Sequence, residues 1–241
     1  MIQRFANPGK FLKLAKAALP WLWALTFAAF AVGLYLALVT SPADYQQGET
    51  VRIMYVHVPA AWMALMVYTI MALASAIAII FRHPLADVAA KTAAPIGATF
   101  CFLALVTGSL WGKPMWGAWW VWDARLTSMF VLFLLYLGYM AVWQAIDDPH
   151  RAATIARIVA LAGFVNVPIV KFSVDWWNSL HQPASVFRMG GPTIDPAMLA
   201  PLLVMGVAYF LLFLALHFTA MRAEIAARRI RALKLIEIGR R

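Results

Sequence analysis

Charged side chains are scarce in this sequence: Asp, Glu, Lys and Arg make up 12% of its 241 residues, whereas hydrophobic residues make up 64%. A soluble domain of this size has too little interior to hide that much apolar surface, so lipid is the expected solvent. A helix needs about 20 apolar residues to cross a hydrocarbon core roughly 30 Å thick. We therefore predict an all-α integral membrane protein with six transmembrane helices, near residues 20–39, 59–81, 92–111, 126–146, 157–174 and 197–218.

Cysteine is nearly absent as well. The single Cys101 cannot form an internal disulfide, and without a Cys-x-x-Cys-His motif the chain cannot attach haem covalently. We interpret Cys101 as a small buried apolar side chain. There is no phosphate-binding loop, so we predict no enzymatic activity and assign any ATP hydrolysis to a partner subunit. Because no repeat, linker or second domain is visible, residues 1–241 are predicted to form one membrane domain.

Acidic residues are outnumbered two to one, 10 against 20 Lys and Arg, and the basic residues are unevenly distributed. If both termini lie on one side of the membrane, that side carries fifteen basic residues and the other carries five. Cytoplasmic segments are enriched in Lys and Arg, so both termini are predicted to be cytoplasmic. The five basic residues of the outer side are Arg52, Lys113, Arg125, Lys171 and Arg188.

The basic ends of the chain fit the same orientation. No small-residue cleavage site follows the first apolar run, which is therefore interpreted as a retained span and not a signal peptide. The basic tail, residues 219–241, is predicted to form a helix on the membrane surface that contacts anionic lipid, with docking to a partner protein as the alternative. The net charge of +10 then requires no nucleic acid.

Tryptophan, by contrast, is abundant and lies mostly on one side. Interfacial tryptophans normally occupy both membrane surfaces, but here three (Trp21, Trp23, Trp143) fall near the cytoplasmic face and eight near the outer face. The eight are Trp62, Trp111, Trp116, Trp119, Trp120, Trp122, Trp176 and Trp177.

Five of these eight lie in residues 111–127, WGKPMWGAWWVWDARLT, which we name the tryptophan segment. Pro114 suits a helix start, and a helix over residues 115–123 would place Trp116, Trp119, Trp120 and Asp123 on one face, widened by Trp122. We predict that this helix lies flat on the outer surface between the third and fourth spans as an aromatic shelf. An interfacial anchor that only holds the loop down is the alternative.

Two charged residues end the tryptophan segment. Asp123 stands where the fourth span begins, so it is predicted to cap that helix by accepting a backbone N–H, a role compatible with a further function. Arg125 would either extend to the interface or neutralise a bound anion.

Two of the five histidines belong to the same face. His83, His150 and His217 fall on the cytoplasmic side, whereas His57 precedes Pro59, which is expected to open the second span, and His181 lies in the outer loop between spans five and six. Each could simply hydrogen-bond its own loop. However, two neutral imidazoles without thiolate or carboxylate companions suit a haem iron better than a closed zinc site, which takes four ligands.

A haem would also account for the other residues of the outer face. A planar, mostly apolar macrocycle favours aromatic walls, and its propionates favour Arg or Lys at the wet edge. The candidates for the propionates are Arg52, Lys113, Arg125 and Arg188.

The tryptophan segment resembles the WWD signature of the haem-handling proteins of cytochrome c maturation. The flanking stretches IMYVHVPAAW and WWNSLHQ are similar to the histidine-bearing segments of that family. The length and the six-span layout match its CcmC members, and the resemblance covers residues 20–218. It implies His57 and His181 as axial iron ligands, with a cofactor-binding surface formed by Trp111, Trp116, Trp119, Trp120, Trp122, Asp123 and Arg125.

The same resemblance implies a biological role. Such proteins hold haem b non-covalently at the outer surface of the bacterial cytoplasmic membrane and pass it to CcmE, a periplasmic haem chaperone. Their expected partners are the small membrane protein CcmD, the ABC transporter subunits CcmA and CcmB, and membrane lipid.

Two other classes of protein remain as alternatives. An electron-transfer haem b or quinone-reactive subunit would place its histidines inside the spans, whereas His57 and His181 are expected in or beside loops. A substrate-translocating transporter would carry paired ionisable residues near the midplane of its spans. None is evident in the sequence, where Lys91 and Lys171 lie near helix ends and are expected to extend to the interface.

Overall fold

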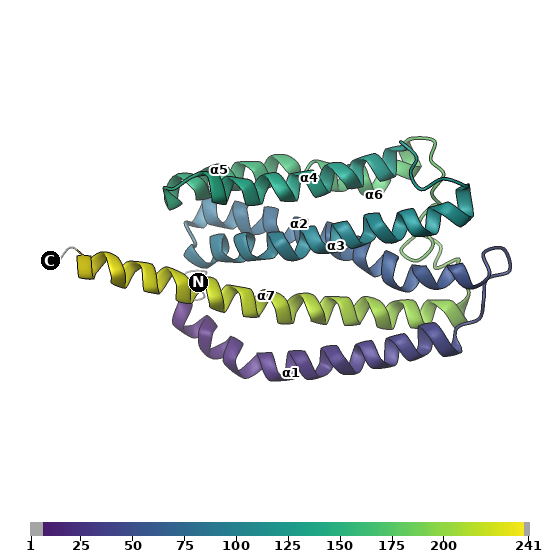
Figure 1. Cartoon of the computed structure of the whole chain (residues 1–241), viewed down its shortest axis with the longest axis horizontal. Helices are drawn as coiled ribbons and strands as arrows, with labels where there is room; N and C mark the ends of the chain where they lie inside the picture. The colour runs from purple at the N-terminus through teal and green to yellow at the C-terminus, as the bar shows by residue number, and fades with distance from the viewer. Residues whose placement is uncertain (1–6, 239–241) are drawn as a thin grey trace.

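The computed structural model describes residues 7–238, which form a bundle of long, roughly aligned helices (Figure 1). The helices are α1 (Pro8–Tyr35), α2 (Met54–Phe81), α3 (Pro84–Trp116), α4 (Ala124–Ala145), α5 (Pro149–Gly163), α6 (Asn166–Trp176) and α7 (Pro196–Ile238). Helices α5 and α6 are separated by two residues and together make one span, so the described part of the chain has six segments long and apolar enough to cross a membrane. The predicted all-α fold with six spans is confirmed.

Several helix starts follow directly from local chemistry. The Asp148 side chain accepts the His150 N–H at 2.9 Å and caps α5, with Pro149 as its first residue. The prediction that Pro59 opens the second span is wrong, because a 3-10 turn, Glu49–Ile53, leads into α2 at Met54 and Pro59 lies inside the helix. A proline there removes only one intrahelical hydrogen bond. His57 consequently lies on the first turn of a helix and not in a loop.

The start of α1 and the end of α7 lie toward the same end of the bundle (Figure 1). At the opposite end, which we call the loop end, lie three connections: residues 41–48 between α1 and the 3-10 turn, residues 117–123 between α3 and α4, and residues 177–195 between α6 and α7. Residues 219–238 of the basic tail are helical, but they continue α7 without a break and project beyond the bundle, so they are not a separate helix. Arg4 and residues 239–241 lie outside the described residues.

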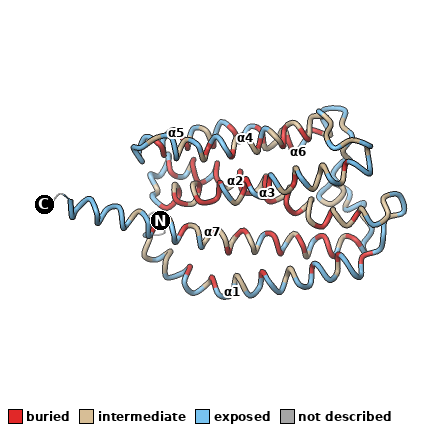
Figure 2. The backbone as a smooth tube through the Cα atoms, in the orientation of Figure 1, coloured by how far each residue is buried: buried red, intermediate tan, exposed pale blue. Residues whose placement is uncertain are grey.

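Small residues allow the helices to approach closely, as is usual between membrane helices. A Cβ at Gly33 of α1 would come within 2.6 Å of the Met205 sulfur of α7, and one at Gly97 of α3 within 2.3 Å of the Tyr136 hydroxyl of α4. The Tyr136 hydroxyl donates to the Ala64 carbonyl of α2 at 2.7 Å. Figure 2 shows buried residues on the inward helix faces and exposed residues on the outward faces. Because many of those outward residues are large and apolar, the outer surface matches lipid.

Ion pairs join the helices near the chain termini. Lys91 of α3 donates to Glu224 of α7 at 2.9 Å and stands over the Trp143 ring, so it is paired within the protein and does not extend freely to the interface as expected. Arg157 of α5 donates to Asp87, in the first turn of α3, at 2.7 Å. Asp87 and Lys91 lie in the first two turns of α3, so neither pair is in the middle of that span, where a transporter would hold its coupling residues.

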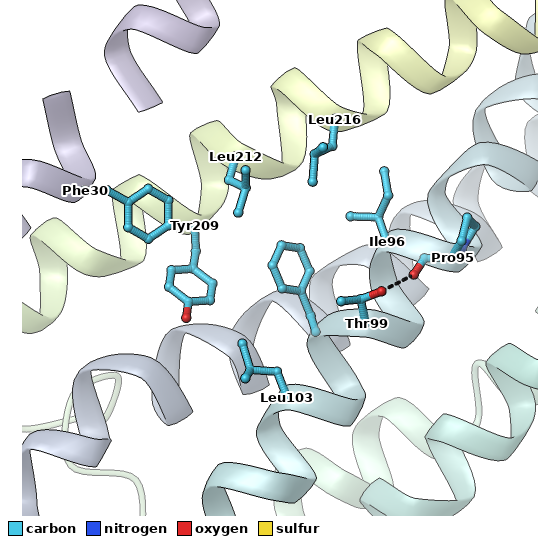
Figure 3. A pocket seen from close by; sticks show the side chains of 9 residues that line it. Phe30, Pro95, Ile96, Thr99, Leu103, Tyr209, Leu212 and Leu216 are labelled. Carbon is cyan, nitrogen blue, oxygen red and sulfur yellow. Dashed lines mark hydrogen bonds between the residues drawn. The ribbon is translucent and has the colours of Figure 1, made fainter. Parts of the chain in front are cut away.

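An apolar groove of about 350 Å³ lies between α1, α3 and α7 (Figure 3). Its walls include Phe30, Phe100, Leu103 and Tyr209, and the hydroxyl of Thr99, which also lines it, bonds to the Pro95 carbonyl. Among the described residues that line the groove there is no carboxylate, histidine or cysteine. Catalysis or metal binding is therefore not expected there, and the candidate site lies at the loop end.

Candidate functional site at the loop end

His57 is held by the last turns of α3. Its Nδ1 lies 3.1 Å from the Thr107 hydroxyl oxygen, which is also 2.6 Å from the Leu103 carbonyl. Because a hydroxyl has one proton and the Leu103 carbonyl can only accept, the Thr107 oxygen accepts from Nδ1–H of His57. That tautomer leaves the Nε2 lone pair of His57 available to a metal.

The walls around His57 also come from α3. A Cβ at Gly108 would lie 2.9 Å from Cε1 of His57, so glycine is what allows the imidazole to lie against the helix. The Trp111 ring stands nearly perpendicular to the imidazole, with centroids 5.7 Å apart. Thr107, Gly108 and Trp111 are within one turn of each other, so a single stretch of α3 positions His57.

His181 is positioned by the end of the tryptophan segment. Its Nδ1 lies 3.2 Å from Oδ2 of Asp123, and the Ser179 hydroxyl donates to the same carboxylate oxygen. The other oxygen of Asp123 accepts the Leu126 N–H at 2.8 Å, which confirms the predicted cap of α4. Asp123 thus starts a helix and orients an imidazole with one side chain, again leaving Nε2 free.

The surroundings of His181 and Asp123 keep the imidazole neutral, which is the state that binds a metal. Burial lowers the pKa of His181, as does the charge of Arg125, and both effects outweigh the opposing influence of Asp123. Burial would by itself raise the pKa of Asp123, but hydrogen bonds from Ser179, the Leu126 N–H and His181 bring it below its ordinary value. At neutral pH, therefore, the imidazole is neutral and the carboxylate is ionised.

The predicted helix over residues 115–123 is wrong. Helix α3 includes Pro114 in its last turn and ends at Trp116, because Gly117 adopts a left-handed conformation (φ +74°) and donates its N–H to the Lys113 carbonyl. Residues 117–123 are irregular. The tryptophans therefore do not share one helical face.

The indoles of the tryptophan segment instead divide into three groups. Trp111 and Trp116 contact the histidines, the latter with its ring centroid 4.9 Å from that of His181. Trp120 packs edge-on against Trp122 and Phe130, and its buried Nε1 has no hydrogen-bond partner. Trp119 and Trp122 are more than half exposed, at 55% and 73%.

The two histidines, 124 positions apart in the sequence, meet at the same end of the bundle through α3. Trp111 touches His57 and Trp116 touches His181, and the two imidazoles are close enough to interact electrostatically. Within residues 7–238, no group of three His, Cys, Asp or Glu side chains is arranged to hold a metal ion.

The four basic candidates for anion binding differ in how they are engaged. Arg125 donates to the Ser173 hydroxyl and the Lys171 carbonyl, both at 3.1 Å, and so ties α4 to α6. Arg52 pairs with Glu49 and donates to the Ala37 carbonyl at 2.6 Å. Lys113 is exposed, donates to the Gly117 carbonyl at 3.0 Å and lies over the Trp119 ring, whereas Arg188 is exposed in the 177–195 loop. Lys113 and Arg188 are the exposed residues of the four, whereas Arg52 and Arg125 are partly buried.

Sequence reasoning missed three residues of this site. Thr107 and Ser179 support the two imidazoles, and Gln47 accepts the indole N–H of Trp111 at 2.9 Å. Ser179 stands two positions before His181, a spacing that could have drawn attention to it. Nothing in the sequence around Gln47 indicates its contact.

The fold and this site together define a class: multi-pass helical membrane proteins with two histidines and a tryptophan-rich segment gathered at one end of the bundle. A sequence model of the family described as heme exporter protein C matches residues 1–236. Heme exporter protein C of Bradyrhizobium diazoefficiens is 59% identical over 98% of this chain and 89% of its own length. The protein of the same name from Paracoccus denitrificans is 45% identical over 96% of both chains. The chain belongs to the heme exporter protein C family.

The similarity extends beyond these two relatives. Heme exporter protein C of Escherichia coli K12 is 46% identical over 83% of this chain and 81% of its own length. A putative cytochrome c biosynthesis ccmC-like mitochondrial protein of Marchantia polymorpha is 46% identical over 82% of each chain.

Proposed function

We propose that this protein binds haem b at the outer face of the bacterial cytoplasmic membrane and delivers it to the periplasmic chaperone CcmE during c-type cytochrome maturation. The names of its relatives support a role in haem export. The observation that carries the proposal is the orientation of the two histidines: both Nδ1 atoms are engaged by protein oxygens, so Nε2 is the nitrogen of each ring that would bind a metal, and both rings lie at the same end of the bundle.

The surrounding residues fit a haem as cargo. His57 and His181 would supply the axial ligands, while Trp111 and Trp116 provide apolar surface beside them. The Asp123–His181 pair has the arrangement by which proteins orient a metal-binding imidazole and raise its basicity. Lys113 and Arg188 are placed to meet the propionates.

The rest of the molecule is proposed to present haem to its acceptor and not to catalyse a reaction. Trp119 and Trp122 are exposed where a soluble acceptor would approach, in agreement with a hand-off from this surface. CcmD, CcmA and CcmB are the proposed membrane partners, and the ATPase of the transporter pair would supply any energy. Lipid surrounds the apolar helix faces, and the proposal involves no nucleic acid.

An electron-transfer haem b subunit is the second candidate, and the buried His217 is where it would have to be sought. His217 lies inside α7, stacks on Phe213 and has its Nδ1 3.4 Å from the Thr92 hydroxyl. Neither neighbour is an iron ligand. A pair of histidines at the loop end therefore favours presentation of haem over electron transfer within the membrane.

The test of the function is the absorption spectrum of the purified protein loaded with haem, recorded before and after addition of the soluble domain of CcmE. We expect a six-coordinate, low-spin spectrum that disappears as the chaperone acquires haem. A protein that binds haem with this spectrum but never transfers it, under conditions that support maturation in membranes, would favour the electron-transfer alternative.

The proposed orientation gives a separate prediction. A reporter that is active only in the cytoplasm should work when fused after Arg241 and fail when inserted at Gly190–Gly191, which lies in the exposed loop between α6 and α7. The expected contrast is nearly all-or-none because a single span, α7, separates these two points and so places them on opposite sides. The reverse pattern would put the histidines inside the cell, where a periplasmic acceptor could not reach them.

A further inference from the structure

The connection between α1 and α2, residues 41–48, forms a compact hairpin built around Asp44. Asp44 and Gly48 exchange both backbone hydrogen bonds, at 3.2 and 2.8 Å, and the Asp44 carboxylate accepts the N–H groups of Gln46 and Gln47. Gly48 has φ +56°, a conformation that favours glycine. The Thr50 hydroxyl donates to the Gln47 carbonyl at 2.7 Å. The backbone of Gln47 is thus fixed on both sides.

The hairpin is also attached to the helices beside it. The last turn of the first span, Leu36–Thr40, is π-helical, and Arg52 donates to its Ala37 carbonyl at 2.6 Å. The Tyr55 hydroxyl, on the first turn of α2, bonds to the Ser41 hydroxyl. Because His57 lies on that same turn of α2, the hairpin and His57 are held as one unit.

The Gln47 side chain extends from this unit to α3. Its Oε1 accepts the indole N–H of Trp111 at 2.9 Å. An indole has one N–H and no acceptor, so the position of that oxygen restricts the rotation of the ring. His57 also restricts the Trp111 ring. The two ring planes stand at 74° to each other, and their centroids are 5.7 Å apart.

We propose that Gln47 is a positioning residue of the haem site: it fixes the Trp111 indole edge-on to His57 and so holds this axial ligand in the orientation that binds iron. The inference rests on the proposed function and adds to it a residue from a connection that carries neither histidine nor tryptophan. Gln47 touches Trp111 and not the iron, so its effect must pass through the indole.

Three variants test the role of the acceptor oxygen. Gln47→Met keeps the size of the side chain but removes the acceptor, Gln47→Glu keeps an acceptor, and Gln46→Met makes the first change at an exposed neighbour whose side chain has no such contact. Loss of one hydrogen bond should weaken haem binding about fivefold, and the six-coordinate fraction of the spectrum should fall with it in Gln47→Met. Gln47→Glu and Gln46→Met should remain near wild type.

The same change in a Trp111→Phe background separates positioning from general stability. If Gln47 acts through the indole, Gln47→Met should have less than about a twofold additional effect there, because the donor is already gone. Three outcomes would each overturn this proposal and leave the histidine assignment standing. The first is an equal fivefold loss in both backgrounds, and the second is a failure of Gln47→Glu to restore binding. The third is a wild-type spectrum for Gln47→Met while His57→Ala loses the six-coordinate form. Unaltered spectra in His57→Ala and His181→Ala would instead show that the histidine assignment itself is at fault.

Discussion

Replacement of both His57 and His181 by alanine is expected to remove most bound haem and all transfer to the chaperone. Each single replacement should leave an iron that is five-coordinate or water-bound, with an altered spectrum, because the remaining imidazole and the indoles still retain some porphyrin. Each imidazole is oriented through its Nδ1 by a protein oxygen, which leaves Nε2 as the nitrogen that would bind iron. The measurement is the absorption spectrum and the haem content of protein purified at matched expression.

The control for this experiment is His150→Ala. His150 is exposed at the start of α5, near the chain termini, and only its backbone N–H takes part in the cap by Asp148. Its replacement should change neither the spectrum nor haem content. Unchanged six-coordinate spectra in both His57→Ala and His181→Ala would mean that the iron ligands lie elsewhere, and the site assignment would have to be abandoned.

The fold was predictable because the membrane imposes a simple rule on the sequence. Spans must be helical and apolar for about 20 residues, so six hydrophobic runs correctly predict six spans. Their ends were less predictable: α2 begins five residues before Pro59 and α7 continues far past the last apolar run. Helix ends depend on single turns and caps, such as the Gly117 terminus of α3, and hydrophobicity does not report these.

Sequence reasoning named residues that the structure brings together at the loop end, but it did not give their geometry. Residue type and the predicted side of the membrane indicated His57, His181, Asp123 and the indoles. The structure brings the two histidines and Asp123 to one end of the bundle. The prediction that the tryptophans share one helical face was wrong, because an argument from helical periodicity assumes that the helix continues. The Thr107 and Gln47 contacts join residues that are 50 and 64 positions apart, and only tertiary packing determines them.

Asp123→Asn should abolish the contribution of His181 to iron binding while leaving α4 intact. Asparagine caps a helix about as well as aspartate, so its oxygen can still accept the Leu126 N–H. Its NH₂ group would then face Ser179 and His181 and could not accept the proton on Nδ1. The imidazole would turn to the tautomer with hydrogen on Nε2, which cannot bind iron. Haem affinity should fall about 10- to 100-fold, the usual effect of losing such a partner.

Two further variants separate the two roles of Asp123. Asp123→Ala loses both, so it should show the spectrum of His181→Ala and also lose about 1 kcal/mol of stability, measured by thermal unfolding. Asp148→Ala removes only a cap, that of α5, and should lower stability by a similar amount without any change in the haem spectrum. If Asp123→Asn retained the six-coordinate spectrum at wild-type affinity, Asp123 would be a cap alone, and the orientation of His181 would have to come from Ser179 and the indole of Trp116.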